Sequence, residues 1–422
     1  MSADWPVPPI VPGLTPPTVL GTAALAHRAF RGAGFDELLA LLARPARTAA
    51  EQAALKLDAA FASQMSLAGP GWRALQDDAL SLCQLFRVGS GFVPRSARPL
   101  PLLALVAPGD LMTNTPIDFI TAHLDVQLDL LFVLPDRPLP PELPDHDVAL
   151  FAVGDGDPAA LARLAPLFRA WPRPALNDPA AIARLSRDQV SRALSGLPGV
   201  CSPATVRAAR ADLDGKIATM LESGPVLIRP VGSHAGRALR KIEARQEIES
   251  YLQTVAADLF FVTSFVDYRA ADGLFRKLRV ALIDGEPLLC HLAVSEHWMV
   301  HYLNAGMTEH ESRRDEEARA MAGFDRGFAH RHAAALAAVA ARIGLDYVQL
   351  DCAETKDGQL LIFEADVAAI VHLMDPPDLF PYKHRQMRQV FDAFDAVLRR
   401  QACAVTGPHP ALRADLSRVR ER

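Results

Sequence analysis

Apolar residues recur at helical spacing in the first quarter of the chain. Between residues 18 and about 90, stretches such as HRAFRGAGFDELLALLAR and QDDALSLCQLFRV place them three and four positions apart, without strand-like alternation. We therefore predict a helical region over residues 18–95, which would serve in dimerisation or as a scaffold rather than in catalysis. The Pro-rich residues 1–17 that precede it predict an extended or disordered lead.

After residue 100 the apolar positions form short unbroken runs instead. LPLLALVA, LDLLFVLP and DVALFAVG are bounded by Pro, Gly or Asp, and stretches with helical spacing separate them. This alternation is typical of a small parallel α/β domain, which we place at residues 96–180. The segment APGDLMTNTP would lie at the carboxyl end of the first strand, where such sheets tend to bind ligands. An ordinary connecting loop is an equally good interpretation of that segment.

Further along, strand-like runs alternate with turns rich in Gly and Asp. A helix at about 180–195 precedes GPVLIRPVGSHAGRALRKI and DLFFVTSFVDYR, and FRKLRVALIDGEPLLCHLAVS reads as a meander that turns at an Asp-Gly pair. A helical stretch at about 312–343 leads to a final hairpin, and residues 401–422 read as a solvated tail. These elements predict a mixed α/β (α+β) protein whose largest domain spans residues 181–400.

The final hairpin, YVQLDCAETKDGQLLIFEAD at residues 347–366, carries carboxylates on apolar strands. With its Asp-Gly pair as a two-residue turn, Asp351 falls opposite Glu364, and Asp366 projects from the same face. Like charges directly across a strand pair destabilise it, and a cation would relieve the repulsion. Oxygen ligands at this density suit Mg²⁺ rather than zinc. The alternative is a solvated face on which the charges splay apart.

Glycines and a basic residue surround the loop of VLIRPVGSHAGRALRKI. Gly232 and Gly236 would let backbone amides approach an anion closely, and Ser233 would add a hydroxyl. Arg229, at the end of the preceding strand, would place a permanent positive charge beside a phosphate. A tight hairpin needs the same glycines, so a purely structural loop remains the alternative.

Two further cations share one face of a strand. In RKLRVALID, the two-residue period puts Lys277 and Arg279 on the same side as Ala281 and Ile283. Two cations beside a buried strand need an anion, either the carboxylates of the hairpin or a nucleotide. Cations and carboxylates on successive strands would hold a metal-bound triphosphate.

The segment EHWMVHYLNAG carries two histidines four positions apart. His297 and His301 would share one helical face if the segment is helical, but Trp298 stands where the HExxH zinc motif has Glu. We therefore expect substrate contacts from His297, His301 or Asn304 rather than zinc. The competing interpretation is a packed aromatic loop with satisfied histidines.

Composition and charge narrow the classes of partner. The 422 residues have a formal net charge of -5 and a pI of about 6.2, which predicts neither nucleic acid nor an anionic membrane as a partner. Half of the residues are hydrophobic, yet no run is long enough to span a membrane. Five scattered cysteines without a CxxC pair, and an N-terminus without signal-peptide features, predict a reduced, cytoplasmic protein.

The order of these elements resembles the ATP-grasp superfamily, especially glutathione synthetase-like and glutamate-adding carboxylate–amine ligases. AIARLSRDQVSRALSGLPGVCSPATV resembles the segment that enters this fold, and PVLIRPVGSHAGRAL resembles its phosphate-covering loop. FFVTSFVDY is similar to the adenine-binding strand, KLRVALIDG to the strand with a phosphate-contacting Arg, and GLDYVQLDCAETKDGQLLIFEAD to the metal-binding segment. The whole also resembles uncharacterised ligases of this superfamily that follow a helical-repeat region.

The resemblance implies an ATP-grasp fold of two α+β subdomains, preceded by a small parallel α/β domain and the helical region. It assigns Arg279 as the catalytic residue and Asp351, Glu364 and Asp366 as metal ligands. It also implies a set of residues that contact ATP: Arg187, Arg229, Gly232, Ser233, His234, Gly236, Thr263, Ser264, Phe265, Val266 and Lys277.

The activity implied by the resemblance needs ATP and Mg²⁺. ATP would phosphorylate a substrate carboxylate, and an amine would attack the acyl phosphate to form an amide or peptide bond. The partners would be a small-molecule carboxylate and an amino acid or peptide amine, and a homodimer is compatible with the family. Gln189 and Arg229 stand where these ligases commonly have Lys, and Asp366 where they commonly have Asn. A nucleotide-binding or scaffold protein without turnover is therefore the alternative.

Overall fold

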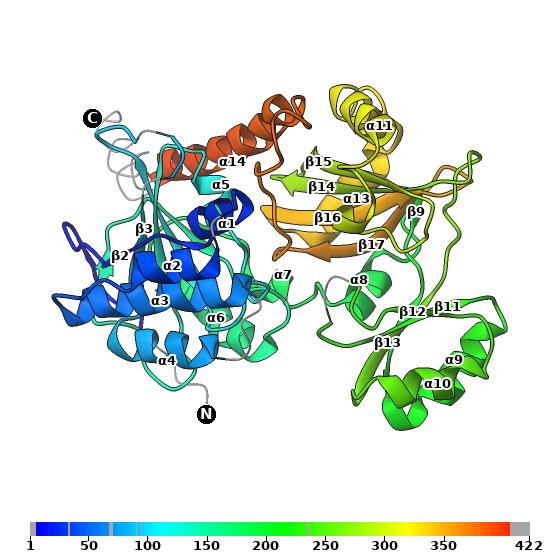
Figure 1. The fold of residues 1–422 in the computed structure, drawn as a ribbon, viewed down its shortest axis with the longest axis horizontal. Helices are drawn as coiled ribbons and strands as arrows, with labels where there is room; N and C mark the ends of the chain where they lie inside the picture. The colour runs from blue at the N-terminus through cyan, green and yellow to red at the C-terminus, as the bar shows by residue number, and fades with distance from the viewer. Residues whose placement is uncertain are drawn as a thin grey trace, which may run out of the picture. The chain divides into compact units, whose positions relative to one another are not determined.

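The computed structural model describes residues 6–32, 34–66, 71–89, 91–93, 95–233 and 236–405. The chain divides into two compact units (Figure 1). The first unit contains residues 1–183, 367–374 and 387–422, and the second contains residues 184–366 and 375–386. Both units combine helices with sheets, which confirms the predicted mixed α/β class. Within the described part of the chain, no helix has the length and hydropathy needed to cross a membrane.

A six-stranded sheet in the order β2-β3-β5-β4-β7-β8 forms the centre of the first unit. Its middle strands are β4 (Leu100–Val106), β5 (Val126–Phe132) and β7 (Val148–Phe151), and they run parallel, as the three apolar runs predict. Most of their side chains are buried, so no polar alternation marks them in the sequence. The remaining strands are β2 (Thr18–Val19), β3 (Leu85–Val88) and β8 (Ala175–Leu176).

The N-terminal region contains helices, as predicted, but also strands that the sequence did not reveal. Strand β3 pairs with β5, β2 pairs with β3, and β1 (Ile10–Val11) pairs with β6 (Leu143–Pro144). Residues of the expected disordered lead and helical region thus take part in sheets, in strands too short to carry a two-residue period. The helices of this unit are α1 (Thr22–Phe30), α2 (Phe35–Leu42), α3 (Ala49–Met65), α4 (Trp72–Leu82), α5 (Asp118–Thr121), α6 (Pro158–Ala170) and α7 (Pro179–Ile182).

Two buried carboxylates fasten the start of α1. Its N-cap residue is Gly21, which has no side chain to accept the first backbone N–H groups. Asp58 accepts from Leu20 N at 2.8 Å and from Gly21 N at 3.1 Å, and Asp118 accepts from Ala23 N at 2.8 Å. Carboxylates from distant parts of the sequence therefore replace a local N-cap side chain. Burial raises the pKa of Asp58 to about 7.

The second unit contains a small antiparallel sheet in the order β10-β13-β11-β12. Its strands are β10 (Thr205–Ala209), β11 (Val226–Pro230), β12 (Arg240–Ile242) and β13 (Leu259–Ser264). Helices α9 (Leu213–Leu221) and α10 (Glu247–Thr254) cover it, with a 3-10 turn η1 (Arg210–Asp212) before α9. Ile217 and Tyr251 of these helices are buried in one cluster with Ile228, Phe260 and Val262 of the strands.

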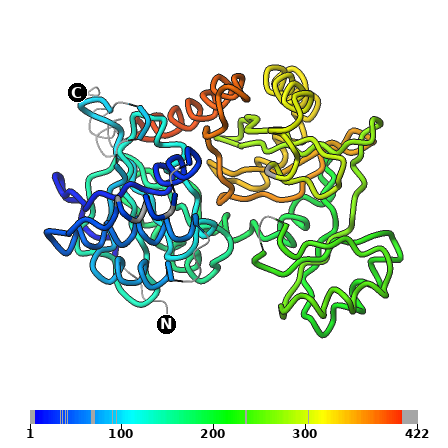
Figure 2. Tube along the Cα trace, viewed as in Figure 1, coloured from blue at the N-terminus to red at the C-terminus, as the bar shows by residue number. Residues whose placement is uncertain are grey.

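A five-stranded sheet in the order β15-β14-β16-β17-β9 completes the second unit. Figure 2 shows the chain returning to this sheet, from yellow-green in β14 and β15 to orange in β16 and β17. The strands are β9 (Val200–Cys201), β14 (Phe275–Ile283), β15 (Glu286–Ser295), β16 (Tyr347–Glu354) and β17 (Leu360–Asp366). The other elements of this region are α8 (Arg187–Leu194), η2 (Tyr302–Asn304), α11 (Glu311–Ala322), α12 (Phe328–Arg331) and α13 (Ala333–Ile343).

Helix α14 (Lys383–Val405) closes the described chain and runs past the predicted domain boundary at residue 400. Its first residues belong to the second unit, and the rest, from residue 387 on, belong to the first. The remainder of the expected tail, residues 406–422, lies outside the described residues.

The turn of the final hairpin is one residue longer than predicted. A two-residue turn would pair Lys356 with Gln359, but Thr355 N donates to Gln359 O at 3.0 Å instead. Gly358 has a φ of 79° and donates to Thr355 O at 3.0 Å, which suits a three-residue turn with glycine in the left-handed position.

A bulge between β16 and β17 cancels this difference. Cys352 lies opposite Ile362, whereas the preceding residue, Asp351, lies opposite Glu364, so Phe363 is the extra residue. The predicted opposition of Asp351 and Glu364 is thus confirmed, although the predicted turn is wrong. The longer turn alone would have placed the two carboxylates out of register.

Candidate functional site

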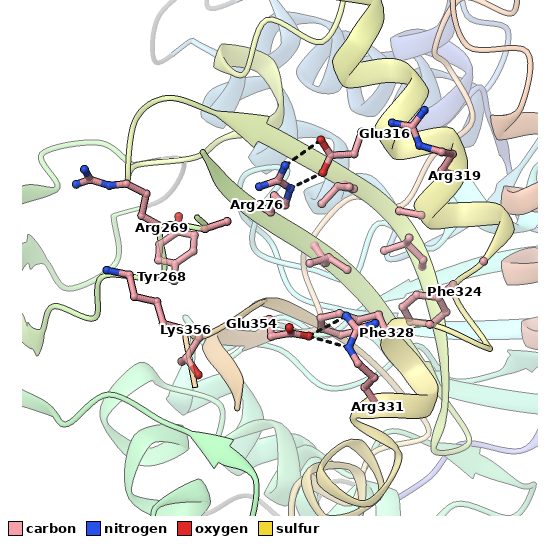
Figure 3. Close-up of a pocket in the computed structure, with 18 of the residues that line it drawn as sticks. Tyr268, Arg269, Arg276, Glu316, Arg319, Phe324, Phe328, Arg331, Glu354 and Lys356 are labelled. Carbon is pink, nitrogen blue, oxygen red and sulfur yellow. Dashed lines mark hydrogen bonds and ion pairs between the residues drawn. The ribbon is translucent and has the colours of Figure 1, made fainter. Parts of the chain in front are cut away.

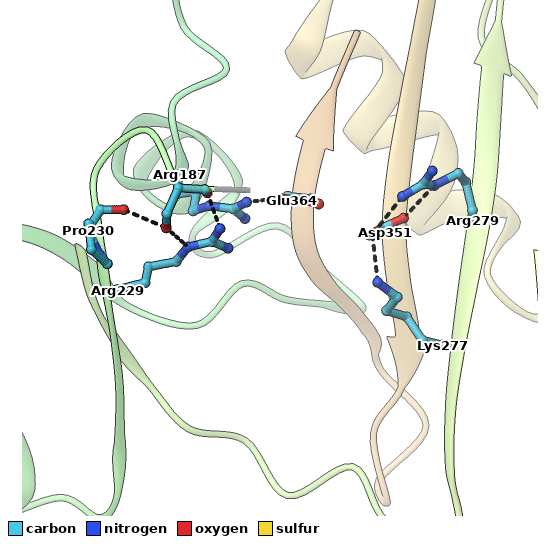
Figure 4. Close-up of polar contacts among 8 residues, drawn as sticks. Arg187, Arg229, Pro230, Lys277, Arg279, Asp351 and Glu364 are labelled. Carbon is cyan, nitrogen blue, oxygen red and sulfur yellow. Dashed lines mark hydrogen bonds and ion pairs between the residues drawn. The ribbon is translucent and has the colours of Figure 1, made fainter. Parts of the chain in front are cut away.

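Charged side chains form a row across one face of the five-stranded sheet. The strand register places Arg279 of β14 beside Asp351 of β16, and Asp351 beside Glu364 of β17. Lys277 lies two residues before Arg279 and shares its face, as its spacing predicts (Figure 4). The row therefore brings together residues far apart in the sequence.

Asp351 is the most enclosed member of this row. Its side chain is 4% exposed, and it accepts from Lys277 Nζ at 2.8 Å and from Arg279 Nε and Nη2 at 2.9 and 3.2 Å. Burial acts to raise the pKa of Asp351, but the charges of Arg279 and Lys277 outweigh it and hold that pKa well below its usual value. Asp351 therefore stays ionised, and each cation of β14 has a carboxylate partner.

Two more arginines reach the other end of the row. Arg187, in the first turn of α8, forms an ion pair with Glu364 (Figure 4). Arg229, at the end of β11, donates from Nε to Ser233 Oγ at 3.0 Å, and burial followed by the charge of Arg187 lowers its pKa to about 10. Three cations thus pair with carboxylates of the hairpin, and Arg229 lies close enough for Arg187 and Glu364 to influence its charge.

The glycine-rich segment forms a hairpin loop between β11 and β12, as predicted. Gly232 and Gly236 have φ values of 77° and 71°, a conformation that favours glycine. Ser233 Oγ donates to Pro230 O at 2.8 Å, which fastens the loop to its first strand. The predicted contact residue His234 lies outside the described residues.

The strand predicted to bind adenine is central in the small sheet. Thr263 pairs with Thr205 on β10 and with Leu227 on β11. The next two N–H groups are engaged as well, since Ser264 N donates to Ala204 O and Phe265 N to Pro225 O, both at 2.9 Å. A ligand could use those two donors only if these bonds opened, so Val266 is the better placed of the predicted residues.

The two histidines of EHWMVHYLNAG do not share a helical face, because residues 297–301 are not helical. His297 is exposed, and Asn304 Oδ1 accepts from His301 N at 2.9 Å. Burial, followed by the charges of Lys277 and Arg279, lowers the pKa of His301, so His301 lies near the charged row. The condition for a shared helical face is therefore not met, and substrate contacts from this segment stay a prediction.

Metal binding was predicted for Asp351, Glu364 and Asp366. Across the described residues, no three His, Cys, Asp or Glu side chains are grouped closely enough to hold a metal ion. Asp351 and Glu364 turn toward cations instead. The donor chemistry still fits Mg²⁺, since three hard carboxylates occupy neighbouring strand positions, with Gln349 opposite Asp366. Asp351 and Glu364 are engaged by Lys277, Arg279 and Arg187, so binding an ion through all three carboxylates would require some of these ion pairs to open.

Sequence reasoning missed a buried polar cluster next to Arg279. Glu317 of α11 is fully buried, and its carboxylate accepts from Leu292 N at 3.1 Å and from the hydroxyls of Tyr302 and Tyr382 at 2.9 and 2.6 Å. Lys383 Nζ lies 3.6 Å from Glu317 Oε1. Nothing in the local pattern distinguishes this Glu or this Lys from the many exposed ones around them.

His291 connects the cluster to the charged row. The register of β14 and β15 puts His291 beside Arg279, and its ring lies 4.6 Å from that of Tyr302. Burial, followed by the charges of Arg279 and Lys383, holds the pKa of His291 well below its usual value. A neutral imidazole therefore lies near two cations, both of which would repel a third positive charge there.

No protein-family model matches the sequence, and no curated protein matches it. The solved structures that match it include the following three. VanG D-Ala:D-Ser ligase from Enterococcus faecalis is 11% identical over 71% of this chain and 100% of its own, with a TM-score of 0.45. D-alanyl-alanine synthetase A from Vibrio cholerae is 10% identical over 73% and 100%, with a TM-score of 0.46. The ATP-grasp ligase PsnB, solved with precursor peptide PsnA2 and AMPPNP, is 14% identical over 74% and 100%, with a TM-score of 0.40.

Proposed function

We propose that this protein is an ATP- and Mg²⁺-dependent ligase that joins a carboxylate to an amine through an acyl phosphate. The observation that carries the proposal is the charged row of the second unit, in which three cations of α8 and β14 pair with carboxylates of β16 and β17, with Arg229 of β11 nearby. A buried ion cluster of this kind is costly unless it serves a charged ligand. Its mixture of cations and oxygen donors suits a nucleoside triphosphate.

The carboxylates of the row and Arg279 have different roles in this proposal. Asp351, Glu364 and Asp366 would hold Mg²⁺, which would neutralise phosphate charge when bound. Arg279 would stabilise the charge of the transferred phosphoryl group, with Asp351 holding its guanidinium in place. The carboxylate oxygen of the substrate would attack the γ-phosphorus as ADP leaves, and an amine would then displace phosphate to form the amide.

The first test is calorimetric titration of the full-length protein with a non-hydrolysable ATP analogue, with and without Mg²⁺. We expect binding that depends on Mg²⁺. In Glu364→Gln, the ratio of the binding constants with and without Mg²⁺ should fall about tenfold or more, because one ligand charge is lost. The thermal midpoint of the variant should stay close to that of the parent, since Glu364 is 24% exposed. Binding of equal strength in Glu364→Gln would contradict the assignment of the metal ligands.

Turnover decides between the ligase and a scaffold that binds nucleotide without reacting. The scaffold alternative is favoured by the pairing of Asp351 with two cations, which makes the row partly self-neutralising. ADP release in the presence of pooled amino acids and short peptides would support the ligase. Mg²⁺-dependent binding without ADP release under any of these conditions would support the scaffold.

A further inference from the structure

A pocket of about 930 Å³ lies on the face of the five-stranded sheet opposite the charged row (Figure 3). Arg276 and Leu278 of β14 line it, and they alternate with Lys277 and Arg279, so the two sets of side chains point to opposite faces. Residues at the end of α11 and in the turn that follows form the facing wall. The pocket is therefore separate from the candidate active site.

The floor of this pocket is apolar. Leu278 of β14 and Leu289 and Leu292 of β15 line it, together with Phe324 and Phe328, whose rings stack at 6.0 Å. A ligand that fills the pocket must bring apolar side chains of its own.

The rim carries more cations than carboxylates, although the protein as a whole has a net charge of -5. Its cations are Arg269, Arg276, Arg319, Arg331 and Lys356, and its carboxylates are Asp267, Glu316 and Glu354. All three carboxylates already form ion pairs with rim cations. No carboxylate among the described residues lies within ion-pair distance of Arg319. The rim thus has two positive charges in excess.

The placement of these cations favours an extended ligand over a compact one. Arg269 and Lys356 reach the pocket from turns at one side, and Arg319 lies at the other side on α11 (Figure 3). Arg276 and Arg331 pair with Glu316 and Glu354. Arg269 and Lys356 share the single carboxylate of Asp267, so one positive charge is left over on their side. A single phosphate or carboxylate would find no convergent set of donors here, whereas a chain with separated acidic groups would meet both sides.

We propose that this pocket docks an acidic, apolar peptide segment, with Leu- or Phe-like side chains on the floor and Asp or Glu side chains at Arg319 and at Arg269 or Lys356. The segment would dock away from the charged row, so the site is a second recognition surface. The inference rests on residues that the proposed ligation does not use.

The test selects binders from a displayed library of random dodecapeptides on the full-length protein, and the enriched peptides are then titrated calorimetrically. We expect enriched sequences that combine Asp or Glu with Leu or Phe. Arg319→Glu should weaken their binding by about tenfold or more, because it replaces attraction with repulsion. Ala320→Trp, which places an indole in the pocket, should abolish binding.

Matched variants separate a site effect from a general one. Arg326→Glu changes the same charge at an exposed position off the pocket, and Ala322→Trp adds the same ring on the exposed side of the helix end, so both should bind like the parent. Peptide binding should also persist in Glu364→Gln. If that variant loses nucleotide binding but still binds the peptides, the inference about this pocket stands. Failure to enrich any binder, enrichment of basic peptides, or equal loss in the control variants would overturn it.

Discussion

Arg279 is bound to its carboxylate in the same manner as an arginine in the other unit, which provides an internal control for its role. Arg279 contacts Asp351 through Nε and Nη2, and Arg87 contacts Asp129 through the same two atoms at 2.8 and 2.9 Å. In both pairs the aspartate is 4% exposed, and the arginine is 17% or 19% exposed. Any difference between the matching variants therefore reports on function rather than on ion-pair geometry.

We expect Arg279→Lys to lower ADP release at least about a hundredfold, since a lysine keeps the charge but loses the planar fork that orients a phosphoryl group. Arg87→Lys should lose a similar amount of stability, about 1–2 kcal/mol, without loss of turnover. Steady-state ADP release and urea unfolding measure the two effects. Equal turnover in both variants would mean that Arg279 is structural.

Asp58 makes the stability of the first unit depend on pH. Its folded pKa of about 7 lies above the unfolded value of about 3.9, so the folded state holds the proton more tightly. Its contribution is then fully present below about pH 4 and is lost as the pH rises through 7. The free energy of unfolding falls by about 1.4 kcal/mol for each pH unit between the two pKa values. Asp118 has its pKa raised by burial and adds a slope of the same sign.

Urea unfolding between pH 5 and 8 should therefore show a stability that falls with pH, and Asp58→Asn should flatten this slope. The variant loses one acceptor for the N–H groups of Leu20 and Gly21, so it should also be less stable at pH 5, by about 1–3 kcal/mol. Asp157→Asn, at the N-cap of α6, serves as the control and should keep the slope. An unchanged slope in Asp58→Asn would show that Asp58 is ionised throughout.

Among the elements, the final hairpin shows what a sequence pattern can and cannot predict. The opposition of Asp351 and Glu364 followed from counting outward from an Asp-Gly turn, and it is observed. The count succeeded because a bulge at Phe363 offsets the extra residue of the turn. A bulge depends on packing, here of Phe363 against Tyr268 at a ring distance of 5.0 Å, and local propensity does not encode such contacts.

Lys383 joins the segment 375–386 to the sheet that carries the candidate site. It is 3% exposed, lies 3.0 Å from Asp375 and 3.6 Å from Glu317, and rests on the ring of Tyr302. We expect Lys383→Met to lower the free energy of unfolding by about 3–5 kcal/mol, because it leaves the carboxylate of Glu317 buried without its cation. Urea titration at pH 7 measures this loss.

Two further variants make the result specific. Arg399→Met removes a more exposed ion pair with Asp395 on the same helix and should cost about 1 kcal/mol or less. The double variant Lys383→Met with Glu317→Gln should recover part of the stability, since it removes both charges. If Lys383→Met costs no more than Arg399→Met, the buried cluster does not hold the segment in place.

For the whole molecule, the sequence predicted the kind of secondary structure in each region better than it predicted which residues belong to each unit. Parallel strands, the glycine loop and the hairpin were visible because each has a local pattern. The chain, however, passes between the two units four times, at residues 183, 366, 374 and 386. Those passages depend on contacts between residues far apart in sequence, such as Glu317 with Leu292 and Glu317 with Lys383. No single stretch of sequence records them.

The return of residues 375–386 to the second unit has a consequence for folding during synthesis. Domains usually fold in order as the chain leaves the ribosome, and an N-terminal domain can finish first. Here neither unit can do so, because each includes residues beyond 366. Glu317 would emerge long before Lys383, with its carboxylate still lacking its partner. Neither unit of the nascent protein can therefore complete its fold until α14 has been translated.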